Sequence, residues 1–173
     1  RRGYRQASAW GVTRRLHLGN QPPLPPLAEG YSVQTTRPAE LPDRERLADL
    51  LNVAFGRSFH TAEEYGAFTR TAPSFAADLD LVAVAPDGSF ASYVGIAYDG
   101  ANRRGIVEPV CTHPDHRRNG LARALIREGL TRLEARGGVD ATVDTGSGEA
   151  ANALYAGLEP SGVYRSSTWR TII

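Results

Sequence analysis

The sequence predicts a mixed α/β fold, in which a central, mostly antiparallel sheet is flanked by helices. From residue 31 onward, apolar patterns with the period of strands alternate with patterns that have the period of helices. Residues 81–98 read as two strands joined by the turn PDGS, in which Asp87 and Gly88 favour a hairpin. Residues 105–145 read as strand, helix and strand, the pattern of a crossover connection.

The predicted order in residues 31–173 is strand, two helices, three antiparallel strands, helix, strand, helix and strand. YSVQTT at 31–36 has the pattern of a strand. An amphipathic helix is expected after Pro42, because apolar residues recur at helical steps: Leu47, Leu50, Leu51, Ala54 and Phe55. Thr61 and Glu64 have the spacing of a capping box for a second, short helix that carries Tyr65 and Phe68.

The clearest helix follows residue 120. One face carries its apolar residues, and two glycines end it: Leu121, Leu125, Ile126, Gly129, Leu130 and Leu133, then Gly137 and Gly138. Residues 139–145 should form a strand, 148–158 a short helix, and 163–173 one or two closing strands.

Residues 1–30 do not show the alternation of strand and helix patterns that residues 31–173 show. Residues 3–18 have strand-like stretches, and the Pro-rich residues 21–30 predict an extended linker, so the main domain is expected to start near Tyr31. Tyr4, Arg5 and Trp10 echo Tyr164, Arg165 and Trp169 with one inserted residue. This echo is either chance, or residues 1–20 are the last strands of a preceding, similar domain.

The composition of the chain limits the classes of protein and of partner that can be expected. The chain has 173 residues, 41% hydrophobic and 23% charged, as a globular domain of one core requires. Its net charge of +1 gives no reason to expect nucleic acid or membrane as a partner. One cysteine cannot form an internal disulfide, so the cytoplasm is the expected compartment. The sequence contains no Met, which predicts a processed form or a piece of a longer polypeptide.

The residues that carry chemistry precede the clearest helix. Gly120 lets a ligand approach the backbone, Ala122 keeps the next turn small, and the free N–H groups of a helix start attract anions. The predicted anion site comprises Arg117, Arg118, Asn119, Gly120, Leu121 and Ala122. Its alternative is a basic helix start on a solvated surface.

This segment resembles the pyrophosphate-binding motif of the GNAT acetyltransferase superfamily, Arg/Gln-x-x-Gly-x-Gly/Ala, which Arg117, Gly120 and Ala122 match position for position. The resemblance covers residues 31–173 and is most specific in 108–125 and 149–155. It implies the GNAT acyltransferase fold, acetyl-coenzyme A as cosubstrate without a metal, and transfer of acetyl to a small-molecule or peptide amine. The backbone of Val110, Cys111 and Thr112 should then pair with the pantetheine arm.

The resemblance also implies catalytic residues. Glu108 directly precedes Pro109, which removes a ladder donor and predicts a bulge, so its carboxylate could serve as general base; the alternative is an edge-strand Glu in solvent. Leu154 and Tyr155 match a pair whose tyrosine protonates the departing thiolate; the alternative is a packed aromatic. Asn152 either bonds the cofactor or occupies an exposed helix position.

Two departures from the family pattern stand out. Gly148 replaces the usual Asn, which leaves one cofactor hydrogen bond open, and Leu158, Glu159 and Pro160 replace Leu-Gly-Phe.

A dinucleotide-binding site and a metal site are the alternatives, and the residues do not have the spacing or number that either site requires. The glycines at 146 and 148 mimic a dinucleotide fingerprint but leave no room for its second strand. Cys111, His113 and His116 are too few for the metal site they would suggest, and a strand thiol such as Cys111 is expected to be buried packing rather than a nucleophile.

Two function classes remain. One is an N-acetyltransferase. The other is a coenzyme-A-binding domain with a structural or regulatory role in a larger protein, next to a preceding GNAT-like domain or as a homodimer. The acceptor is not predicted: Phe55, Phe59, Tyr65 and Phe68 either wall its pocket or belong to the core.

Overall fold

The computed structural model describes residues 3–19, 22–23 and 26–171, and of residues 7–9 only the backbone. Residues 1, 2 and 20 of the predicted first segment, residues 21, 24 and 25 of the predicted linker, and the end of the last predicted strand therefore lie outside the described residues.

One sheet of seven strands organises the molecule, in the order β2-β3-β4-β5-β6-β1-β7. Only β5 and β6 pair in parallel, and every other neighbouring pair is antiparallel. The strands are β1 (Tyr4–His17), β2 (Ser32–Thr35), β3 (Asp80–Val84), β4 (Phe90–Asp99), β5 (Arg104–Thr112), β6 (Asp140–Thr145) and β7 (Gly162–Thr171). The predicted mixed, mostly antiparallel sheet with one crossover is confirmed.

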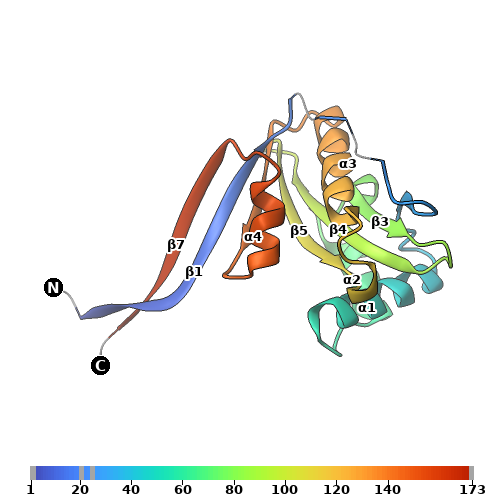
Figure 1. The fold of residues 1–173 in the computed structure, drawn as a ribbon, viewed down its shortest axis with the longest axis horizontal. Coiled ribbons are helices and arrows are strands. Elements are labelled where there is room, and N and C mark those ends of the chain that lie inside the picture. Colours follow the sequence, from blue (N-terminus) through green and yellow to red (C-terminus); the bar gives the residue numbers. More distant parts are fainter. Residues whose placement is uncertain (1–2, 20–21, 24–25, 172–173) are drawn as a thin grey trace.

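Four helices flank this sheet (Figure 1): α1 (Leu41–Phe55), α2 (Ala62–Thr71), α3 (Leu121–Ala135) and α4 (Glu149–Ala156). Each lies where the sequence predicts it. The hydroxyl of Thr61 accepts a hydrogen bond from the N–H of Glu64 at 3.1 Å, which confirms Thr61 as the cap of α2. Among the described residues, no helix has the length and apolarity needed to cross a bilayer.

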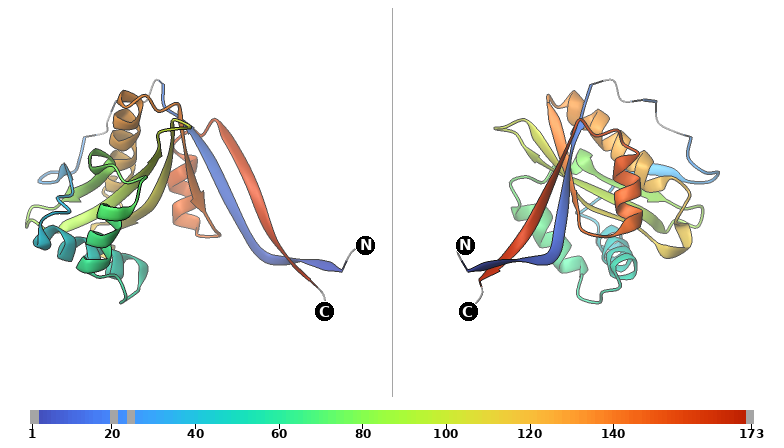
Figure 2. Two further views of the ribbon diagram at one scale, coloured as in Figure 1. Left: turned by 180° about the vertical axis from the view of Figure 1, so that it is seen from behind. Right: turned by 60° about the vertical axis from the view of Figure 1, so that its left-hand side comes forward.

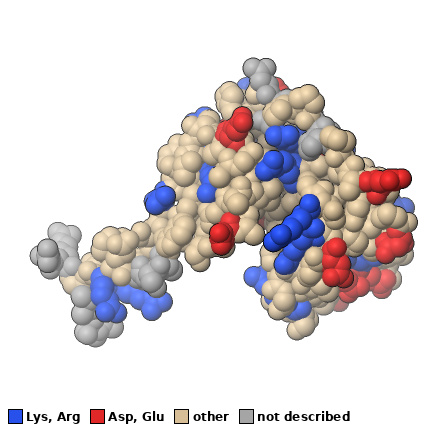
Figure 3. Space-filling model, viewed as in Figure 1, with Lys and Arg blue, Asp and Glu red and all other residues tan. Residues whose placement is uncertain are grey.

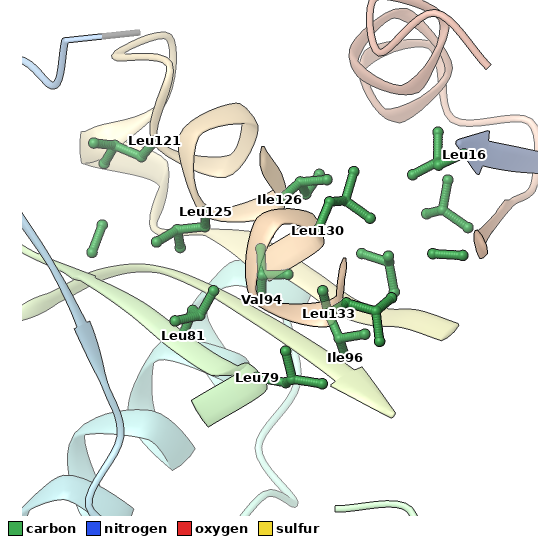
Figure 4. Close-up of a cluster of buried hydrophobic side chains, with 14 of the residues drawn as sticks. Leu16, Leu79, Leu81, Val94, Ile96, Leu121, Leu125, Ile126, Leu130 and Leu133 are labelled. Carbon is green, nitrogen blue, oxygen red and sulfur yellow. The ribbon is translucent and has the colours of Figure 1, made fainter. Parts of the chain in front are cut away.

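Helix α3 packs on one face of the sheet (Figure 4). Its predicted apolar stripe is buried against residues of β3, β4 and β6. The contact is close at Gly129, where an added Cβ would come within 2.5 Å of the Ile96 side chain. This explains why a glycine occupies the middle of the stripe, despite the cost of glycine in a helix.

The opposite face is covered by α1 and α2. Leu47, Leu50 and Leu51 of α1 and Tyr65 of α2 form a second buried cluster with Val82, Phe90, Tyr93 and Cys111 of the sheet. Strand β3 contributes side chains to both clusters, because Leu81 and Ala83 point to α3 while Val82 points to α1. A sheet covered on both faces explains the unbroken burial from Phe90 to Ile96.

Strand β1 takes a place that the sequence did not predict. It lies inside the sheet, antiparallel to β6 on one side and to β7 on the other. Beyond the sheet, β1 and β7 continue as a two-stranded ribbon that projects from the body of the molecule (Figures 1 and 2). Residues before the predicted linker thus belong to this sheet. A further role for them as the last strands of a preceding domain stays a prediction.

Candidate active site

Strands β5 and β6 pair over a short stretch and then separate. They pair only at Arg104, Gly105 and Ile106 of β5, whereas β5 runs on to Thr112 and β6 to Thr145. From Val107 onward, the edge of β5 that faces β6 has no strand partner among the described residues. This opening exposes a row of backbone donors and acceptors to which an extended ligand can pair as an added strand.

An ion-pair cluster holds the strands together at the closed end of their paired stretch, away from the opening. Asp140, the first residue of β6, is buried, and its carboxylate lies 2.8 Å from Nε of Arg15 on β1 and 3.0 Å from Nε of Arg104 on β5. Asp140 therefore ties three neighbouring strands together at the start of the stretch where β5 and β6 pair.

Strand β5 carries a bulge inside the opening. Val94 pairs with Val110 and Ile96 with Val107, so the single residue Gly95 of β4 faces both Glu108 and Pro109. The bulge predicted at the Glu-Pro step is confirmed, and it leaves the Glu108 side chain exposed.

The predicted anion site begins α3. Gly120 is the N-cap residue, with φ 72°, and an added Cβ would meet nothing within 4 Å. The first bond of the helix runs from the N–H of Ala124 to the Gly120 carbonyl at 3.0 Å, so the preceding N–H groups of the first turn have no intrahelical acceptor. A pyrophosphate fits this arrangement of free donors and open space.

The side chains of this loop are placed differently from one another. The Arg117 guanidinium donates to the carbonyls of Thr112 and Ala54, both at 3.4 Å, so its charge stays at the base of the loop. Asn119 donates to the carbonyl of His116 at 3.1 Å. Arg118 is exposed and left-handed, with φ 66°. Leu121 is buried in the core, so only its backbone can face a ligand, while Ala122 is half-buried.

Basic side chains gather near this helix start. The loop and the first two turns of α3 together carry Arg117, Arg118, Arg123 and Arg127. Figure 3 shows blue side chains near the middle of this face, on the side of α3 that looks toward α4. The concentration of arginine is local, since the net charge of the whole chain is +1. It favours a ligand that carries several phosphate charges.

Tyr155 lies across the opening from β5. It sits on α4 and is 6% exposed. Burial raises the pKa of its phenol, the charge of Glu108 raises that pKa further, and the guanidinium of Arg14 opposes the shift. The two predicted catalytic residues are therefore brought within electrostatic reach of each other, although they come from different strands and helices.

Arg14 is a member of this site that the sequence did not indicate. It belongs to β1, is 8% exposed, and donates from Nη2 to Oδ1 of Asn152 at 2.9 Å. Its Nη1 has no protein partner. No sequence pattern could have connected Arg14 with α4, because the connection depends on β1 lying beside β6.

Asn152 holds the start of α4 in place. Its amide donates to the carbonyls of Gly146 and Gly148, both at 2.8 Å, while its oxygen accepts from Arg14. Both amide hydrogens are thus used within the chain. Its role as a cofactor ligand stays a prediction.

A mostly apolar cavity of about 230 Å³ lies on the α1–α2 side of the bulge. It is lined by Ala48, Leu51, His60, Thr61, Glu64, Tyr65, Phe68, Tyr93 and Pro109. A smaller hollow between Phe68, Tyr93 and Pro109 reaches Glu108. Of the four aromatics considered in the sequence, Tyr65 and Phe68 line the cavity, whereas Phe55 and Phe59 are exposed elsewhere.

A buried carboxyl fixes the floor of the cavity. Asp80, 3% exposed, accepts hydrogen bonds from the hydroxyls of Thr36 and Tyr65 and, at 2.5 Å, from that of Tyr93. Burial raises the pKa of Asp80, and these three hydroxyls oppose the rise. The two tyrosine rings are thereby held in fixed orientations as cavity walls.

The side chains of the remaining predicted residues make contacts within the chain, and the pairing of the Val110, Cys111 and Thr112 backbone with a cofactor stays a prediction. Val110 and Thr112 are half-buried on β5, and Thr112 contacts Ser92 through hydroxyls 2.9 Å apart. Cys111 points into the α1 cluster, and burial raises the pKa of its thiol to about 12. His113 caps the turn before α3 by accepting from the N–H of Asp115, and His116 bonds the Tyr31 hydroxyl at 2.8 Å. Within the described part of the chain, no cluster of metal-ligating side chains occurs.

Comparison with known proteins agrees with this geometry. The family model of the acetyltransferase (GNAT) family matches residues 44–158. The chain belongs to this family. No curated protein matches the chain significantly.

Solved structures share the fold. A GCN5-related N-acetyltransferase from Sphaerobacter thermophilus is 23% identical, with a TM-score of 0.76 over 98% of this chain and 55% of its own. A tandem GNAT protein from the clavulanic acid biosynthesis pathway is 17% identical, with a TM-score of 0.67 over 95% of this chain and 55% of its own. The ribosomal-protein-S18-alanine N-acetyltransferase from Escherichia coli is 19% identical, with a TM-score of 0.59 over 74% of this chain and 76% of its own. The chain thus spans about half the length of the first two.

Proposed function

We propose that this protein is an N-acetyltransferase that passes acetyl from acetyl-coenzyme A directly to an amine. The observation that carries the proposal is the opening between β5 and β6, with the anion site of α3 beside it and Glu108 and Tyr155 on its two sides. Membership of the GNAT family supports the same activity.

The chain offers separate groups for each part of the cofactor. The free N–H groups around Gly120 and the charge of Arg118 would hold the pyrophosphate. The open edge of β5 at Val110, Cys111 and Thr112 would pair with the pantetheine arm. Acetyl-coenzyme A supplies an activated acetyl thioester when bound.

Two side chains would move the protons. An amine acceptor is mostly an ammonium ion at neutral pH and must lose a proton before it attacks. Glu108 is exposed at the bulge and reached by the smaller hollow, which makes it the candidate base. Tyr155, whose pKa is raised, keeps its proton at neutral pH and is the candidate donor to the leaving sulfur.

The acceptor would place its body in the cavity of α1 and α2. The walls are mainly aliphatic and aromatic, with His60, Thr61 and Glu64 as polar lining residues. This lining favours an amine with an apolar or aromatic body over a polyamine or a heavily hydroxylated amine. A small aryl-alkyl amine or a peptide N-terminus with an apolar first residue has this chemistry.

An acetyl-transfer assay over a panel of amines tests the proposal. The panel should contain phenethylamine, a peptide with an N-terminal Leu, spermidine and an aminoglycoside, and acetyl-coenzyme A binding should be measured in parallel. Turnover with the first two acceptors, and its weakening by Phe68→Ala through KM, is the expected result. Absence of turnover with every amine, despite cofactor binding, would favour the second function.

That second function is a coenzyme-A-binding unit with a structural or regulatory role in a two-domain protein. The projecting ribbon favours it, and so does the likeness in fold to a tandem GNAT protein. The two functions differ in one measurement, since both require cofactor binding and only the first requires turnover.

A further inference from the structure

The ribbon of β1 and β7 has one polar and one aromatic face. Paired residues share a face and side chains alternate along a strand, so Trp10, Ser167, Trp169, Gln6 and Tyr4 all lie on the face that carries Val12. Near the sheet that face is core, because Val12 is 4% exposed. Farther from the sheet, the side chains of this face are exposed to solvent: Trp10 is 44%, Tyr4 58% and Trp169 59% exposed.

The outer half of the ribbon also has open edges. β6 pairs with β1 only from Val12 to His17, so the stretch from Tyr4 to Trp10 has β7 as its sole strand neighbour among the described residues. A two-stranded ribbon is at best marginally stable in water without a covered apolar face. Aromatic side chains and unpaired backbone at the same place are the features of a sheet that receives another one.

The ribbon has a local half-turn symmetry that shows what fits there. Gln6 donates to the Ser167 hydroxyl at 2.8 Å. Trp10 stands opposite Ser167 on one side of this contact, and Trp169 stands opposite Gln6 on the other. A half-turn about the contact exchanges the two tryptophans approximately and moves Val12 to the region of Thr171. It is not exact, because the register of β1 and β7 shifts between Gln6 and Trp10.

We propose that the outer half of this ribbon is the docking surface for a second unit of the same GNAT fold, joined to this one in the same polypeptide through β1. Since this unit covers Val12 with its own core and adds β6 beside it, a symmetry-related unit would cover Trp169 and Thr171 in the same way. The corresponding strand of that unit adds to the free edge of β7.

The sequence of the ribbon identifies which strand belongs to which unit. Trp10 of β1 repeats Trp169 of β7 on the same face, and β7 is the last strand of this unit. Tyr4 and Arg5 recur in the sequence as Tyr164 and Arg165, one residue out of step. The outer half of β1 is therefore the last strand of the second unit, which precedes it. The Sphaerobacter acetyltransferase, of which this chain matches 55%, keeps nearly half of its own length outside the match, where a second, somewhat smaller unit would fit.

Hydrogen exchange tests the proposal in two samples: the 173-residue chain and the polypeptide as the cell makes it. In the isolated chain, the amides of residues 4–6 and 169–171 should exchange rapidly, while those of α3 stay protected and report an intact fold. In the natural polypeptide the ribbon amides should slow on the order of a hundredfold or more. Equal exchange in the two samples overturns the proposal.

Two matched substitutions sharpen the test. Trp169→Ser in the natural polypeptide should restore rapid exchange of the outer ribbon, whereas Tyr164→Ser should not, because Tyr164 is equally exposed, at 58%, but lies on the opposite face. Equal effects of the two variants would contradict the aromatic docking face. A protected ribbon in the isolated chain, together with a dimer in sedimentation, would make a second copy the occupant and overturn the proposal.

Discussion

Tyr155 of α4 lies within electrostatic reach of Glu108 of β5, so the carboxylate adds to the effect of burial and raises the pKa of the phenol. Neither residue is near the other in sequence. The candidate proton acceptor and the candidate proton donor thus come from two different elements near one open strand edge. This division of roles is the basis of the first two predictions.

Glu108→Gln should lower turnover by about 10²–10⁴-fold, because the amide cannot take the proton of the acceptor ammonium. The dissociation constant of acetyl-coenzyme A should stay at the wild-type value. Steady-state kinetics and calorimetry check the two parts. Glu64→Gln, at the rim of the cavity, is the control and should lose far less; a similar loss in both variants would speak against Glu108 as the base.

Tyr155→Phe should lower turnover by a comparable factor, while the fold stays intact because only a hydroxyl is removed. Since the pKa of Tyr155 is raised above its ordinary value of about 10, the phenol stays protonated and no decline in rate from its ionisation should occur between pH 6 and 9. Wild-type turnover in the variant across this range would make Tyr155 a packing residue. Tyr98→Phe, away from the opening, is the matched control.

Gly120→Glu should abolish stabilisation by acetyl-coenzyme A, because a carboxylate would occupy the pyrophosphate position. At a hundredfold excess over its dissociation constant, the cofactor adds about 2.7 kcal/mol to the wild type, a melting shift of roughly 5–10 °C. Gly88→Glu is a matched control: both glycines have positive φ and open space around a built Cβ. Both variants should lose about 1 kcal/mol to backbone strain, but only Gly88→Glu should keep the cofactor shift.

Cys111 should be inert in the native protein. With the pKa of its thiol raised to about 12, roughly one molecule in ten thousand carries the thiolate at pH 8. Iodoacetamide should therefore leave the folded chain unlabelled and modify it after unfolding in guanidinium, as mass spectrometry can show. Rapid labelling of the folded chain, or an acetylated Cys111 after mixing with acetyl-coenzyme A, would instead support a mechanism in which Cys111 carries the acetyl group as a covalent intermediate.

Asp43 should make the free energy of unfolding depend on pH in the acid range. Burial works to raise its pKa, but hydrogen bonds and charge from Arg37, together with Arg46, outweigh burial and lower it. A lowered pKa contributes stability that is present above the unfolded value of about 4 and lost as the pH falls through the folded value. Asp43→Asn should cost about 2 kcal/mol at pH 7 in denaturant unfolding, and less at pH 3. Asp49→Asn, exposed on the same helix, should cost little at either pH.

The elements from β2 to α4 could be predicted because each is coded by its own residues. The α3 stripe, the Thr61 cap, the Asp87–Gly88 turn and the Glu-Pro bulge are all local patterns, and all are present. The helix start at Gly120, on which the predicted anion site depends, was predictable for the same reason, since a helix start and its glycine are adjacent in sequence.

What could not be predicted depends on long-range pairing. Arg14 reaches Asn152 only because β1 lies between β6 and β7, and no pattern in residues 3–18 specifies those neighbours. The cavity floor likewise joins Thr36, Tyr65, Asp80 and Tyr93 from four separate elements. Hydroxyls at such positions give no sequence signal until the fold brings them to one carboxyl.

The position of β1 has a consequence for the order of events during synthesis. Its inner half, residues 12–17, is made well before its partners, which are residues 140–145 and 162–165. At about 5–20 residues per second, the strand waits roughly 7–30 s for them. During that interval Val12 and Leu16, which end up buried, have no sheet to join. Closing the sheet is therefore a late, long-range step, and we expect a nascent chain stalled before residue 140 to require chaperone protection of its N-terminal strand.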